Sequence, residues 1–145
     1  MTMEKLRKEA FHKMLCLMKL HRKTLEHSLE STGVFQGQHR LLMNISDNPN
    51  RSQKELADRM EISTATVAIS LKKLEKGGYV TRDTDINDTR FNQVVVTEKG
   101  RNVVEKSKQI FRDLDEKMFE GFSREEIERL MEYISRLTEN VKKIN

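Results

Sequence analysis

Apolar side chains recur at helical spacing over much of the chain, with charged and polar residues filling the positions between them. This pattern predicts a long first helix over residues 4–29 and a second helix over residues 36–46. Turn-forming residues and a proline at 47–50 end the second helix, because proline lacks the backbone N–H that a continuing helix requires.

Two short helices separated by a tight turn are predicted next. Ser52 followed by Glu55 is typical of a capping box, which begins a helix over residues 53–60. Ser63 caps the following helix, and Gly77-Gly78 end it by accepting left-handed backbone angles. The inward residues of this helix are spaced four and three apart: Val67, Leu71 and Leu74.

A β-hairpin is expected after the glycines. The runs 79–82 and 93–97 are rich in β-branched and aromatic residues and are separated by a polar loop. A further long helix begins at Thr97 and breaks near Gly121, and Ser123 with Glu126 caps the last helix. The residues expected to face inward are Val104, Phe111, Leu114 and Met118 in the first of these helices, and Ile127, Leu130, Ile134, Leu137, Val141 and Ile144 in the second.

The predicted fold is mainly α-helical with a small β-hairpin wing, that is, a winged helix-turn-helix with long N- and C-terminal helices. A helix-turn-helix needs its second helix held rigidly across the first, because the DNA major groove admits about one helix. Ala57 is small enough for close approach, and Ile62 can fill the turn. We expect a dimerisation helix over 1–35, a DNA-binding lobe over 36–100 and C-terminal dimerisation helices over 101–145.

The outward face of the second short helix carries no charge in its first two turns. Small side chains there let the backbone approach the bases, Ile69 can contact thymine methyl groups, and lysines further along suit phosphates. The candidate DNA-binding residues of this recognition helix are Ser63, Thr64, Ala65, Thr66, Ala68, Ile69, Lys72 and Lys73, and Ser52 is the helix-turn-helix cap. Two ordinary surface helices with caps are the alternative interpretation.

The hairpin loop carries Asp88, Thr89 and Arg90, which are the candidate DNA contacts of the wing. An arginine is attracted by the negative potential of a narrow minor groove, and Asp88 can orient its guanidinium before binding. The alternative is a solvated charge pair, which contributes little energy.

Composition agrees with a helical DNA-binding protein and does not prove one. The net charge is +4, with 34% charged and 6% aromatic residues, and no apolar stretch is long enough to span a membrane. A cytoplasmic protein is therefore expected. The chain contains neither a phosphate-binding glycine loop nor a nucleophile-elbow sequence, so an enzyme is not expected.

The segments 74–82 (LEKGGYVTR), 88–90 (DTR) and 96–100 (VTEKG) together resemble the MarR family of bacterial transcription regulators, and the order of elements is similar over nearly the whole chain. The resemblance implies a recognition helix over 64–73, a wing contact by Arg90, a dimer built from the terminal helices, and a small anionic or aromatic ligand. Many relatives carry a polar or basic residue where this chain has isoleucine, so the operator sequence is not implied.

The expected function is sequence-specific binding of double-stranded DNA by a homodimeric repressor at an inverted repeat, released by a small-molecule effector and requiring no cofactor. One alternative is a peroxide- or thiol-responsive regulator acting through Cys16, since peroxide-sensing relatives keep a cysteine in this helix. They also supply tyrosines around it, whereas the second helix here has Gly37 and His39, and inert packing among apolar neighbours is the competing explanation. A winged helix that binds protein is the other alternative.

The four histidines have no metal-ligand spacing and are expected at the surface, and no metal site is expected. They are His12, His21, His27 and His39.

Overall fold

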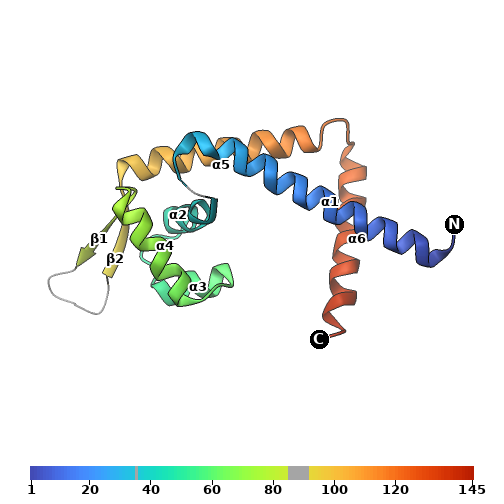
Figure 1. Cartoon of the computed structure of the whole chain (residues 1–145), viewed down its shortest axis with the longest axis horizontal. Coiled ribbons are helices and arrows are strands. Elements are labelled where there is room, and N and C mark those ends of the chain that lie inside the picture. The colour runs from blue at the N-terminus through green and yellow to red at the C-terminus, as the bar shows by residue number, and fades with distance from the viewer. Residues whose placement is uncertain (35, 85–91) are drawn as a thin grey trace. The chain divides into compact units, whose positions relative to one another are not determined.

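The computed structural model describes residues 1–34, 36–84 and 92–145, and the chain divides into two compact units, Met1–Phe111 and Arg112–Asn145. Figure 1 shows the elements in chain order. The first unit contains α1 (Met3–Leu29), the short 3-10 helix η1 (Glu30–Thr32), α2 (Gln36–Asp47), α3 (Gln53–Met60), α4 (Thr64–Lys76), β1 (Val80–Thr84), β2 (Asn92–Val96) and the larger part of α5 (Glu98–Met118). The second contains the end of α5 and α6 (Arg124–Lys142).

The helix boundaries follow the capping residues closely. Each of Ser52, Ser63 and Ser123 adopts an extended backbone, and its hydroxyl accepts a hydrogen bond from the backbone N–H three residues later. Glu126 returns the interaction by accepting from the Ser123 N–H at 2.8 Å, which completes the predicted capping box of α6. These bonds satisfy backbone donors that a helix start would otherwise leave unpaired.

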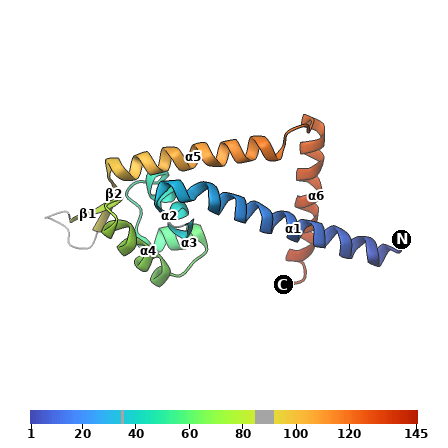
Figure 2. The same cartoon turned by 45° about the horizontal axis from the view of Figure 1, so that its top comes forward.

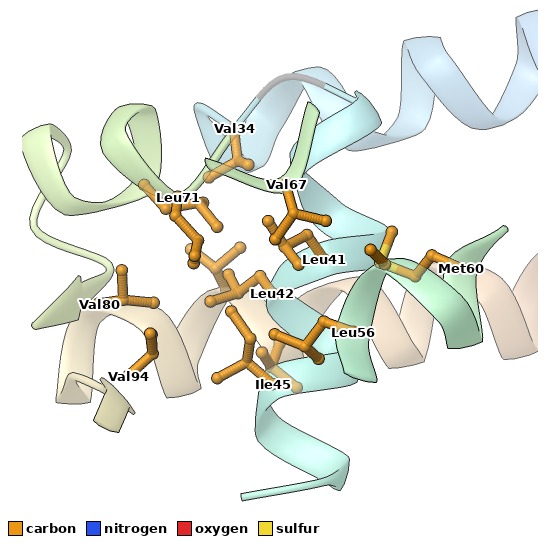
Figure 3. Close-up of a cluster of buried hydrophobic side chains, with 14 residues drawn as sticks. Val34, Leu41, Leu42, Ile45, Leu56, Met60, Val67, Leu71, Val80 and Val94 are labelled. Carbon is orange, nitrogen blue, oxygen red and sulfur yellow. The ribbon is translucent and has the colours of Figure 1, made fainter. Parts of the chain in front are cut away.

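The core of the first unit is built around α2. Leu41, Leu42 and Ile45 on this helix are buried against α3, α4 and the hairpin (Figure 3). Burying each such side chain contributes about 1.5–3 kcal/mol. The other core residues are Val34, Leu56, Ala57, Met60, Val67, Leu71, Leu74, Val80, Val94, Val103 and Val104.

The two strands form an antiparallel hairpin in which Val80 pairs with Val96 and Arg82 with Val94. Val80 and Val94 are buried, whereas Thr81 and its partner Val95 are exposed, so one face of the hairpin packs on the core. The hairpin lies beside α4, as the rotated view in Figure 2 also shows. The chain therefore passes from α4 directly into a strand pair that shares its core.

Two local expectations were wrong. Gly78 has a left-handed backbone (φ 77°), but Gly77 is right-handed, and a Cβ at that residue would collide with the Tyr79 ring. His39 is buried, with 1% of its surface exposed, because it lies one helical turn before the buried Leu42.

The apolar rows of the long helices are largely exposed in the single chain. In α1, Leu6, Met14 and Leu17 are exposed, and every described residue of α6 except the partly covered Ile127 is exposed. In α5, Val104 is buried as expected, while Met118 is exposed. Over residues 1–34, 36–84 and 92–145, no helix combines the length and the apolar composition of a membrane span.

Candidate nucleic-acid interface

The turn between α3 and α4 is compact. Glu61 adopts a left-handed backbone (φ 55°), and the Ile62 N–H donates to the Ala57 carbonyl oxygen at 3.1 Å. Ala57 is buried, and the Ile62 side chain packs partly buried against the core. Both residues therefore have the positions expected for a turn that fixes the second helix against the first.

Opposite faces of α4 have opposite character. Val67, Leu71 and Leu74 are almost fully buried and fix the helix on α2 and α3. The candidate DNA-binding residues lie on the remaining surface: Ser63, Thr64, Ala65, Thr66, Ile69, Lys72 and Lys73 are exposed, and Ala68 is half-buried. The structure thus places this predicted set on one accessible surface.

The N-terminus of α4 is held by a small hydrogen-bonded group. Ser63 Oγ accepts from the Thr66 N–H at 3.1 Å and lies 2.8 Å from Thr66 Oγ1.

At the start of α3, Arg51 Nη1 donates to Glu55 at 2.9 Å, beside the capping hydroxyl of Ser52. This hydrogen bond, helped by Ser52, holds the pKa of the Glu55 carboxyl below its ordinary value.

Contacts at the base of the hairpin join α4 to the strands. Glu75 on α4 pairs with Arg82 on β1, with 3.2 Å between Oε2 and Nε. The Thr97 hydroxyl donates to the Gly78 carbonyl at 2.6 Å, and Lys99 Nζ donates to the Gly77 carbonyl at 2.8 Å. The sequence interpretation missed these contacts because they join residues that helical or strand periodicity does not relate.

Asp88, Thr89 and Arg90, the predicted wing contacts, lie outside the described residues. The strands that carry this loop are described, and Val94 and Val96 attach β2 to the core.

His39 joins three segments of the first unit. Its Nε2 lies 2.7 Å from the Val34 carbonyl oxygen and 3.0 Å from Thr32 Oγ1, and its Nδ1 lies 2.8 Å from Ser107 Oγ on α5. Since a carbonyl only accepts, Nε2 carries the proton of the neutral ring, and Nδ1 accepts from Ser107. Burial lowers the pKa of His39, and the bond to Val34 opposes this only in part.

Cys16 is exposed in the single chain, and its Sγ lies 3.4 Å from His12 Nε2. The thiol-responsive alternative stays a prediction. Within the described part of the chain, no group of three or more His, Cys, Asp or Glu side chains is placed to hold a metal ion.

The sequence and the fold of this chain are similar to those of known proteins. The sequence profile of the MarR family matches residues 32–90. A MarR transcriptional regulator from Methanosarcina mazei Go1 is 26% identical, with a TM-score of 0.73 over 95% of this chain and 99% of that chain.

Two Staphylococcus aureus structures are each 21% identical and are similar in fold. MarR in complex with salicylate and kanamycin has a TM-score of 0.80 over 97% of this chain and 95% of that chain. The MepR–DNA complex has a TM-score of 0.69 over 97% of this chain and 96% of that chain.

A helix-turn-helix followed by a hairpin, with long helices before and after it, defines a winged helix-turn-helix protein. Residues 32–90 match the MarR family model, and the fold over nearly the whole chain is similar to that of a MarR transcriptional regulator.

Proposed function

We propose that this protein is a cytoplasmic, homodimeric transcriptional repressor that binds an inverted repeat of double-stranded DNA with α4 in the major groove. The observation that carries the proposal is the exposed face of α4, which has small and neutral residues first and lysines after them. Base edges require close approach, and phosphates attract lysine, so this order suits a helix that enters the groove by its N-terminal end.

The dimer is proposed from the exposed apolar rows of α1 and α6. Residues 1–35 and 101–145 would form the dimer, and 36–100 the DNA-binding lobe. Two-fold symmetry would place the two α4 helices about one turn of DNA apart, which matches an inverted repeat. Arg90, oriented by Asp88 and flanked by Thr89, would contact the minor groove beside each half-site.

Release by a small effector completes the proposal. A relative of the same fold has been solved with salicylate and kanamycin, and another has been solved with DNA. An effector that binds better to the DNA-free arrangement would lower affinity for the operator, since it shifts the population toward that arrangement.

Fluorescence anisotropy of labelled duplexes, selected from random DNA, tests the function. We expect affinity to fall steeply with salt, because each lysine–phosphate contact releases a counterion and contributes about 0.9 to the logarithmic slope. Lys72→Ala with Lys73→Ala should lower that slope by about two per bound chain.

The matched control removes two charges elsewhere, with Lys142→Ala and Lys143→Ala at the end of α6. This pair should leave the slope unchanged. Equal slopes for both double variants, or binding insensitive to salt, would contradict the proposal and favour a module that binds protein.

A further inference from the structure

Ile69 is an exposed isoleucine on α4, a helix whose other large apolar residues are buried. It has 58% of its surface exposed, and among the described residues between 21 and 94 it is the one large apolar side chain that is exposed. At about 100° per residue it points some 160° away from the buried Val67 and Leu71. The core therefore gives no reason for an isoleucine at this position.

The surroundings of Ile69 indicate what it contacts. Ala65, one turn earlier, is small and exposed, so the helix backbone can approach a partner closely on this face. Lys72, Lys73 and Lys76 follow Ile69 by three, four and seven residues, and they place positive charge on the same side. Glu75, the acidic residue of this segment, is directed to Arg82 on β1. An apolar contact beside clustered positive charge fits DNA better than an apolar protein surface.

Thymine is the base that offers an apolar group in the major groove. Its 5-methyl group projects there, whereas guanine, adenine and cytosine present hydrogen-bonding groups and no methyl. An isoleucine placed against such polar groups would remove water from them without replacing its hydrogen bonds, which is unfavourable. Against a methyl group the same side chain buries apolar surface from both partners.

We propose that Ile69 reads the 5-methyl group of one thymine in each half-site of the operator. The inference rests on the proposed function, in which α4 is the recognition helix. It adds a class of operator to that function: half-sites with an A·T pair, thymine in a fixed strand, opposite the second turn of α4. The affinity gained is apolar in origin, so it is expected to persist when salt weakens the phosphate contacts.

Uracil substitution tests the proposal, because deoxyuridine pairs like thymidine and lacks only the methyl group. Each thymine of the duplex selected by the wild-type protein is replaced, one position at a time and in both half-sites together. We expect one position at which uracil weakens wild-type binding about three- to tenfold per half-site. Ile69→Ala should bind the thymine duplex more weakly and lose the preference for thymine over uracil at that position.

The matched control is Val95→Ala, which shortens another exposed apolar side chain on the hairpin. This variant should keep the preference for thymine over uracil at the base position assigned to Ile69. Thermal unfolding of each variant checks the fold, which Ile69→Ala should leave intact, since the side chain is outside the core cluster.

Three outcomes would overturn the inference. In the first, the wild-type protein binds its duplex tightly and tolerates uracil at every position. In the second, Ile69→Ala keeps the preference for thymine over uracil. In the third, the selected half-site lacks a required thymine. Each of these leaves the DNA-binding function standing. If the wild-type protein recovers no duplex at all, the proposed function fails first and this inference fails with it.

Discussion

Single side chains of the first unit hold together segments that are distant in the sequence. The His39 ring connects Thr32 in η1 and Val34 to Ser107 on α5, over a separation of 68 positions for the last contact. Ser107 Oγ also lies 2.7 Å from the Val103 carbonyl oxygen, so its one hydroxyl hydrogen is shared between this oxygen and His39 Nδ1. Because none of these partners is charged, burial is the main influence on the histidine and favours its neutral form.

The first prediction concerns the acid stability of the fold. The pKa of His39 is lower in the folded chain than in the unfolded chain, so below about pH 6.5 the unfolded chain binds the proton more strongly. The free energy of unfolding therefore decreases as the pH is lowered. His39→Gln should remove this dependence of stability on pH. At pH 8 the substitution should lower the free energy of unfolding by about 1–3 kcal/mol, because it weakens buried hydrogen bonds. Urea unfolding at several pH values between 8 and 5 measures both effects. The same dependence on pH in the two proteins would show that His39 is not its source.

Residue-level detail was predictable where it followed from local chemistry. Ser63 and Ser123 could be identified as caps because capping joins residues three apart. The burial of His39 was missed although its spacing from Leu42 was available, because histidine was assumed to remain at the surface. The Glu75–Arg82 pair could not be found this way, since it depends on how a strand returns along a helix.

The start of α5 packs tightly against Tyr79, the residue that precedes β1. Gly100, in the first turn of α5, lies so near the Tyr79 carbonyl that it leaves no room for a side chain. Lys99 donates to the end of α4, and its ammonium lies 4.6 Å from the centre of the Tyr79 ring. This junction therefore fixes helix, strand and following helix together, and its tightness was not evident from the alternation of apolar residues.

Gly100→Ala should destabilise this junction. Its new Cβ would overlap the Tyr79 carbonyl oxygen and crowd Val96, which should cost about 1–3 kcal/mol or more as the backbone shifts. Gly37→Ala is the matched control, because a Cβ there meets nothing within 4 Å and alanine favours the helix by up to about 1 kcal/mol. Chemical denaturation of both variants gives the comparison. Equal stabilities would mean that the junction can relax at little cost.

At the scale of the whole molecule, the long helices carry apolar surface that the single chain leaves open. Leu137 on α6 has 48% of its surface exposed, and Ile134 and Val141 are similarly open. The spacing of these residues predicts a packed seam, and the single chain leaves them exposed, because a sequence does not specify which surface covers such a seam. That information lies in the assembly, where a second copy is the proposed partner.

A charge in this seam should separate the chains. Leu137→Glu is expected to lower the dimer affinity by at least tenfold, because a buried carboxylate without a partner is strongly unfavourable. Ser135→Glu places the same charge about 160° around α6 from Leu137 and should leave the assembly unchanged. Sedimentation equilibrium of both variants measures the association. Dissociation by neither variant would exclude the α6 seam from the interface.

The bonds that tie Gly77, Gly78 and Glu75 to the strands and to α5 also constrain how the protein can be switched. A helix fastened at its C-terminal end to both a hairpin and the next helix cannot bend or slide on its own without breaking several contacts at once. In the dimer proposed above, an effector would therefore change the spacing between the two α4 helices by turning each lobe as a rigid body, while each lobe keeps its own shape.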